Sequence, residues 1–211
     1  TTIGDFQAVW AVDGAGKLQH YWWGPKTGGV QHDTWGSGAV GRPSVFVTEN
    51  GQQHAFTRGT GKTLEHYWWT PGTNGAIAHD TWGTNIGGDP AALAIGEFQD
   101  AWAVDGSGSL QHWYWGPKTN GVKTDTWGSG AVGRPSVFVT SNGEQHAFVR
   151  GRASGKSRGR VQEGLRVPPD GGGGSRRVGR GRAPVRGGWR CGRGDLGHGH
   201  QCRIRGSRAD A

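Results

Sequence analysis

Hydrophobic and polar residues alternate along short segments of this chain, and the same segments return farther along it. Within Leu18–Trp23 every second side chain falls on the same face, which places Leu18, His20 and Trp22 together. Leu64–Trp69 and Leu110–Trp115 repeat the pattern, whereas no window shows a convincing apolar period of 3.6 residues. The pattern therefore predicts β-strands rather than helices.

Other strand patterns recur between these segments. Ser44–Thr48 returns at Ser136–Thr140, and Asp-Thr-Trp-Gly supplies a further short strand. A fourth pattern has four copies: Gln7–Val12, Gln53–Arg58, Asp100–Val104 and Gln145–Arg150. Pairs that readily adopt positive φ separate the strands and predict two-residue hairpin turns: Asp13-Gly14, Asn50-Gly51, Asp105-Gly106 and Asn142-Gly143.

A spacing of 46 residues relates the copies, as four aromatic positions show: Trp10, Phe56, Trp102 and Phe148. Four short antiparallel strands in about 46 residues is the size of one propeller blade. We therefore predict an all-β chain of four-stranded antiparallel β-propeller blades, with units at about 1–42, 43–89 and 90–134 and a partial unit at 135–151. Propellers usually close with four to eight blades, so we expect about three blades of an incomplete propeller, with self-association through open blade edges. Assembly of short chains into a closed ring is the alternative.

The repeat pattern stops after Gly151. Residues 152–211 hold 15 of the 24 basic residues but four of the 16 acidic ones, a net charge of +11, whereas residues 1–151 carry −3. Trp189 is the only one of the 21 aromatic residues in this segment. So little apolar surface cannot offset the entropy cost of ordering, and we expect a disordered Arg/Gly-rich tail.

Two interpretations of the tail stay open. An Arg/Gly-rich arm would bind nucleic acid or another anionic surface. Alternatively, GC-rich DNA read in the wrong frame yields the same Arg, Gly, Ala and Pro, and the change falls inside a repeat unit rather than at its boundary. We favour the frame error, which an intact blade in another frame after codon 151 would establish.

Several function classes lack their usual signatures. No apolar run approaches 18 residues, so we expect no membrane insertion. Gly59–Thr63 and Gly155–Ser157 resemble phosphate-binding loops, but Phe56 and Arg150 stand where the first glycine belongs. The Cys and His spacing within Cys191–Cys202 matches no strong zinc pattern. Because every acidic residue of 1–151 recurs or lies in a turn, we predict no metal site, no cofactor and no enzymatic activity.

Tryptophan and histidine carry the candidate chemistry, and eleven tryptophans fall within residues 1–151. An indole face can stack on the apolar side of a sugar while Asp or His bonds to its hydroxyls. We predict that neutral sugars bind between adjacent blades at nine residues: Trp23, Trp35, Trp69, Trp82, Trp115, Trp127, His20, His66 and His112. The alternatives are a packing role for the Asp-Thr-Trp-Gly tryptophans and a structural hydrogen bond for the histidines.

The units read P-S-V-F-V-T-x-N-G-x-Q-H-A-F-x-R-G, then G-x-L-x-H-Y-W-W, then D-T-W-G. This series resembles the PLL-like β-propeller repeat of bacteria, and the resemblance covers residues 1–151. The aromatic, Gly-rich repeats of fucose-binding fungal lectins and of tectonins are similar. The resemblance implies a seven-bladed propeller that binds glycans between neighbouring blades, with fucose or O-methylated sugars as ligands.

Two function classes follow from these observations. A multivalent lectin would gain avidity from repeated weak sites. An accessory propeller of a larger secreted enzyme would carry the same repeats, and both readings imply a secreted protein. Nucleic-acid binding is a third class, which depends on the tail being genuine.

Overall fold

The computed structural model describes residues 1–152, which form four antiparallel sheets. The first sheet contains β1 (Thr2–Ile3), β2 (Phe6–Val12), β3 (Leu18–Trp23) and β4 (Gln31–Gly36). The second contains β5 (Ala39–Val47), β6 (Gln53–Gly59), β7 (Leu64–Trp69) and β8 (Ile77–Gly83). The third contains β9 (Ala91–Ile95), β10 (Phe98–Val104), β11 (Ser109–Trp115) and β12 (Lys123–Ser129), and the fourth pairs β13 (Ala131–Val139) with β14 (Gln145–Gly151).

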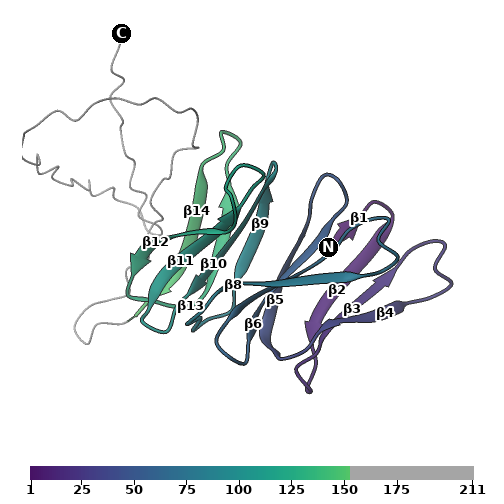
Figure 1. The fold of residues 1–211 in the computed structure, drawn as a ribbon, viewed down its shortest axis with the longest axis horizontal. Coiled ribbons are helices and arrows are strands. Elements are labelled where there is room, and N and C mark those ends of the chain that lie inside the picture. The colour runs from purple at the N-terminus through teal and green to yellow at the C-terminus, as the bar shows by residue number, and fades with distance from the viewer. Residues whose placement is uncertain (153–211) are drawn as a thin grey trace, which may run out of the picture. The chain divides into compact units, whose positions relative to one another are not determined.

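Each four-stranded sheet is an up-and-down meander in which neighbouring strands pair in chain order. The sheets follow one another from the purple to the green end of the chain (Figure 1), and the first strands β5, β9 and β13 contact one another in turn. This arrangement confirms the prediction of all-β propeller blades. The alternating strand patterns also lie where they are predicted, and β3 and β7 have the predicted bounds. Sequence inspection missed β1 and β9.

The hairpin loops differ from the prediction. The loop between β2 and β3 spans residues 13–17, and Gly16 rather than Gly14 has a positive φ, of 73°. Asp13 Oδ1 accepts the backbone N–H groups of Ala15 and Lys17, each at 2.9 Å. The prediction of a two-residue turn at Asp13-Gly14 is therefore wrong, because the aspartate closes a longer loop by bonding to the backbone ahead of it.

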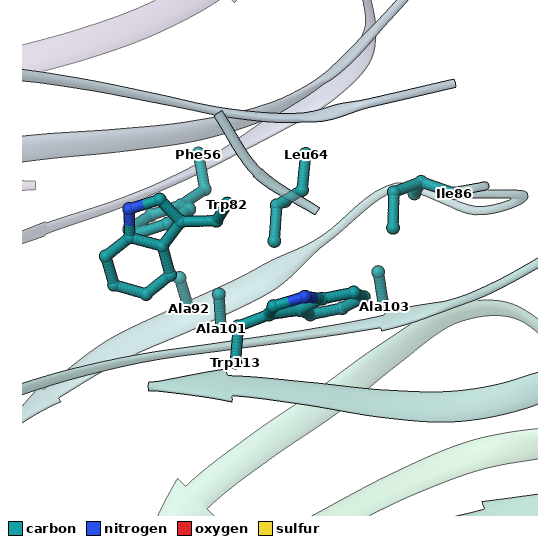
Figure 2. Close-up of a cluster of buried hydrophobic side chains, with 8 residues drawn as sticks. All are labelled: Phe56, Leu64, Trp82, Ile86, Ala92, Ala101, Ala103 and Trp113. Carbon is teal, nitrogen blue, oxygen red and sulfur yellow. The ribbon is translucent and has the colours of Figure 1, made fainter. Parts of the chain in front are cut away.

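Side chains from adjacent sheets form the core. Figure 2 shows the cluster between the second and third sheets, where Phe56, Leu64 and Trp82 lie opposite Trp113. Equivalent clusters lie between the first and second sheets and between the third and fourth. Because each sheet contributes one buried aromatic face to the next, stability comes from contacts between neighbouring repeats.

Glycine at the end of the first two Asp-Thr-Trp-Gly segments makes room for this packing. A Cβ on Gly83 would lie 2.6 Å from Cε2 and Nε1 of Trp113. A Cβ on Gly36 would likewise overlap the ring of Tyr67, which occupies the equivalent place on the second sheet. An aromatic ring of the following sheet therefore covers each of these glycines.

A pair of hydrogen bonds, here called the bracket, joins β5 to β9, the first strands of the second and third sheets. Ser44 Oγ on β5 accepts the N–H of Ala92 on β9 at 2.8 Å, and its hydroxyl donates to the carbonyl of Ala92 at 3.4 Å. Ser44 and Ala92 are both buried. The bracket thus satisfies backbone groups that would otherwise be buried without a partner.

We expect Ser44→Ala to lower the free energy of unfolding by about 2 kcal/mol, because it leaves the buried N–H of Ala92 unsatisfied. Urea unfolding monitored by tryptophan fluorescence measures the change. Ser136→Ala is the matched control, since Ser136 occupies the same repeat position on β13 but is exposed. Equal losses for the two variants would contradict the role assigned to the bracket.

One face of the first sheet has no covering sheet among the described residues. Its large exposed side chains are Val9, Tyr21, Trp23 and Val30. Self-association through this face stays a prediction. No helix among residues 1–152 is long and apolar enough to cross a membrane. The predictions of a disordered tail and of no zinc pattern in Cys191–Cys202 concern residues outside those that the structure describes, Arg152 excepted.

Candidate functional site

Each predicted histidine is buried and held by an aspartate on the next strand. His20 Nδ1 lies 3.0 Å from Asp33 Oδ1, and the corresponding pairs His66–Asp80 and His112–Asp125 are each 2.9 Å apart. The strand register creates these pairs, because each histidine lies directly opposite its aspartate. A carboxylate only accepts hydrogen bonds, so Nδ1 carries a hydrogen in each histidine.

Aromatic rings enclose the same histidines. His20 stacks between Trp10 and Trp22, with centroid separations of 4.2 and 4.8 Å, and Trp35 packs edge-on at 5.2 Å. His66 and His112 occupy equivalent stacks. This environment explains why burial lowers the pKa of His20 despite the opposing charge of Asp33.

These contacts assign a role to every residue of the Asp-Thr-Trp-Gly segment. In the first sheet Asp33 holds the histidine, and the Thr34 hydroxyl donates to Gln19 Oε1 at 3.0 Å. Trp35 is buried in the core between sheets, and Gly36 accommodates the next ring. The second and third sheets repeat the threonine bond, with Glu65 and Gln111 as acceptors. The segment therefore builds the blade, and its tryptophan packs in the core between neighbouring sheets.

A cavity of about 540 Å³ lies between the first and second sheets. The first sheet contributes six lining residues: Phe6, Ala8, His20, Trp22, Asp33 and Trp35. The second contributes Gly51, Gln53, Trp69, Pro71 and Gly75. Three lining residues carry a buried polar atom that lacks a hydrogen-bond partner among the described residues: His20 Nε2, Trp35 Nε1 and Gln53 Oε1. Aromatic walls therefore surround two potential acceptors and one donor.

A second cavity, of about 320 Å³, occupies the equivalent place between the second and third sheets. His66, Trp68, Asp80, Trp82, Gln99 and Trp115 line it at positions equivalent to lining residues of the first cavity. Two positions differ, because Gln52 and His54 replace Phe6 and Ala8. His54 is 1% exposed and its Nδ1 lies 2.9 Å from His66 Nε2. The second cavity is thus smaller, and one of its polar atoms, His66 Nε2, already has a partner within the protein.

The structure gathers most of the predicted site residues into these two cavities. His20, Trp35 and Trp69 line the first, and His66, Trp82 and Trp115 line the second. His112 and Trp127 belong to the aromatic cluster between the third and fourth sheets. Trp23 lies on the uncovered face of the first sheet and lines neither of these two cavities.

Sequence reasoning missed several lining residues. Gln53 and Gln99 line the two cavities and share the repeat position of Gln7 and Gln145, so the 46-residue spacing could have revealed them. Trp22 and Trp68 could have been found in the same way, as members of the aromatic strand. The repeat pattern could not have revealed Ala8, because its contribution to the cavity is the space left by its small side chain.

Comparison with known proteins identifies the repeat. A family model described as a repeat of unknown function (DUF346) matches residues 7–44, 52–92 and 99–136. The chain belongs to this family. Each DUF346 match begins at or next to the repeated glutamine of one sheet and ends in the first strand of the following sheet. One DUF346 unit therefore contains both the histidine–aspartate pair of a blade and the strand that starts the next.

A solved structure of another protein has a similar fold. The chain superposes on a triple arginine-to-alanine mutant of AofleA from Arthrobotrys oligospora with a TM-score of 0.53 and 12% identity. The match covers 78% of this chain and 54% of that one, so the chain spans about half the length of AofleA. No curated protein matches the chain. The tandem repeat and the propeller-like fold are thereby shown, whereas the PLL-like family stays a resemblance.

Proposed function

We propose that this DUF346 protein is a lectin-like binding protein that holds neutral sugars between adjacent blades. The observation that carries the proposal is the cavity of about 540 Å³, in which aromatic side chains surround unpartnered polar atoms of His20, Trp35 and Gln53. A sugar presents an apolar face of C–H groups and a rim of hydroxyls, which matches both features. The resemblance of the repeats to propeller lectins is a second support.

The polar atoms favour a neutral ligand with hydroxyl groups. A lone-pair nitrogen on His20 and an amide oxygen on Gln53 accept from O–H groups, and the Trp35 indole N–H donates to a sugar oxygen. Among residues 1–152, neither Lys nor Arg lines the cavity. An anionic ligand would therefore find no cationic partner there, whereas hydroxyls would satisfy atoms whose burial without a partner is costly.

The aromatic wall favours a sugar that carries a methyl group. Burial of one methyl or methylene group contributes about 0.8 kcal/mol. Fucose offers its C6 methyl and an O-methylated sugar offers its ether methyl, and Phe6, Trp22 and Trp69 supply apolar surface for such a group. We therefore propose fucose-type or O-methylated sugars as the ligand class, displayed on glycans outside the cell.

A binding role accounts for the site better than catalysis. Asp33 and Asp80 are bonded to His20 and His66, and the same pair recurs in the third sheet as a blade-building contact. No group of three or more metal-binding side chains occurs within residues 1–152. We propose that the glycan is bound and released unchanged.

We expect Trp69→Ala to weaken glycan binding at least about fivefold, since stacking on an aromatic ring contributes on the order of 1 kcal/mol or more. A glycan array followed by titration calorimetry measures the effect on the full chain. Trp23→Ala is the matched control, because Trp23 has the same repeat position but lies outside both cavities. Unchanged binding by Trp69→Ala, or an equal loss in both variants, would contradict the proposal.

We expect the same binding at low and high salt, because the ligand is neutral and Debye screening acts on charges. Titrations at about 0.05 and 0.5 M NaCl provide the measurement. Binding of nucleic acid through the basic residues 152–211 would instead weaken steeply as salt rises. A glycan affinity that falls tenfold or more over this range would show that charge, rather than the cavity, holds the ligand.

A further inference from the structure

The three histidine–aspartate pairs are alike at Nδ1 but differ at Nε2. Because Nδ1–H donates to the aspartate, Nε2 of a neutral histidine is an acceptor. Whatever side chain lies beside Nε2 then determines whether that acceptor is free for a ligand. The neighbour comes from one repeat position, which holds Ala8 in the first sheet, His54 in the second and Asp100 in the third.

His54 satisfies this acceptor from within the protein. Its Nδ1 lies 2.9 Å from His66 Nε2, and the two ring planes are within 7° of parallel with centroids 5.2 Å apart. His66 Nδ1 is already committed to Asp80, so His54 must be the donor at Nδ1. The imidazole of His54 also stands where the first cavity has only the methyl group of Ala8, in keeping with cavity volumes of about 320 and 540 Å³.

Asp100 occupies the position in the third sheet. Its Oδ1 lies 2.9 Å from His112 Nε2, and Asp100 is 2% exposed. His112 therefore meets a carboxyl oxygen on both sides, at Asp100 and at Asp125. Burial raises the pKa of the Asp100 carboxyl, and its protonated form donates to Nε2, so here, too, the protein supplies the partner.

His20 alone among the three has an Nε2 without a partner in the part of the chain that the structure describes. His20 is 6% exposed and lines the first cavity beside Ala8. We infer that the residue at the position of Ala8, His54 and Asp100 selects which cavity accepts a ligand. The cavity beside Ala8 is then the open site, and His54 closes the second by filling its space and occupying His66 Nε2, although Nε2 of His54 itself has no partner among the described residues. The inference rests on the proposed function and names His20 Nε2 as the acceptor of a sugar hydroxyl.

Two reciprocal substitutions in the full chain test the selector position, with methyl α-L-fucopyranoside as the probe. This sugar carries both a C6 methyl and an O-methyl group. Calorimetry and native mass spectrometry should give one site in the wild type and two in His54→Ala, because that change frees His66 Nε2 and enlarges the second cavity. Ala8→His should lose the first site, with affinity lowered at least about tenfold.

Controls separate the selector from a change in folding. His146→Ala removes the equivalent histidine of β14 and should leave one site. Ala8→Asp supplies a smaller partner for His20 Nε2 and should weaken binding even if Ala8→His fails to fold. Two sites in the wild type, or one unchanged site in both His54→Ala and Ala8→Asp, would overturn the selector while leaving sugar binding intact.

A measurement without sugar keeps the two ideas apart. Nitrogen-15 NMR of the histidine side chains should show His20 with hydrogen on Nδ1 and a bare Nε2, and His66 with an Nε2 that accepts a hydrogen bond until His54 is replaced. Hydrogen on Nε2 of His20, or a His66 signal that His54→Ala leaves unchanged, would overturn the inference. No binding of the fucoside together with the expected NMR signals would count against the proposed sugar class alone.

Discussion

Gly83→Ala should lower the free energy of unfolding by about 3 kcal/mol, at the upper end of what overpacking a core costs. The added Cβ would lie 2.6 Å from Cε2 and Nε1 of Trp113, a distance that nonbonded carbon atoms do not adopt. Trp113 is 5% exposed and packs among Phe56, Leu64 and Ala103, so its ring has nowhere to move without disturbing the cluster in Figure 2. The second and third sheets would then separate.

Urea unfolding followed by tryptophan fluorescence measures this loss. Gly14→Ala is the matched control, because no atom lies within 4 Å of the Cβ it would add and Gly14 has no positive φ. We expect that variant to keep the wild-type stability within about 0.5 kcal/mol, as surface substitutions usually do. A Gly83→Ala protein that is as stable as Gly14→Ala would refute the contact between blades described above.

Acid should destabilise the protein through the buried histidine pair of the second sheet. Burial lowers the pKa of His54 from 6.5 to about 3, and burial also lowers the pKa of His66 against the opposing effect of Asp80. Above pH 6.5 both the native and the unfolded protein hold these residues neutral. As the pH falls from 6.5 towards 3, the unfolded chain takes up protons that the native protein excludes, so stability is lost over this range.

The loss attributable to His54 should reach about 3 kcal/mol at pH 4, at about 1.4 kcal/mol for each pKa unit. Urea unfolding at pH 7 and pH 4 provides the comparison. His54→Gln can still donate to His66 Nε2 but takes up no proton, so its stability should fall much less between these pH values. His32→Gln, at an exposed residue of β4, is the control. Parallel pH profiles for the wild type and His54→Gln would contradict the prediction.

Most of the fold could be predicted from local patterns in the sequence. Leu18–Trp23 alternates because one face packs on the next sheet, and Gly36 and Gly83 recur because a ring lies over each. The strand β9 escaped notice because Ala91–Ile95 lacks the aromatic residue that marks Ser44–Thr48 and Ser136–Thr140. The loop at Asp13 was misjudged because a side-chain acceptor, rather than a glycine at the next position, sets its length.

The site was harder to predict than the fold because half of it comes from the neighbouring blade. Sequence reasoning found His20 and Trp69, but only the packing of two sheets shows that they line one cavity. Asp33 holds Nδ1 of His20, a contact that becomes visible only once β3 is paired with β4. Ala8 matters because its small side chain leaves space beside His20 Nε2, and no residue pattern in the sequence marks such a space.

The central claim is that a sugar occupies the cavity between the first two sheets. Titration of the full chain with methyl α-L-fucopyranoside, followed by NMR of the indole and imidazole groups, tests it most directly. We predict saturable shifts of His20, Trp35 and Trp69 at a common dissociation constant, with Trp23 unaffected. No saturable shift at those three residues, or saturable shifts confined to residues outside the cavity, would contradict the claim.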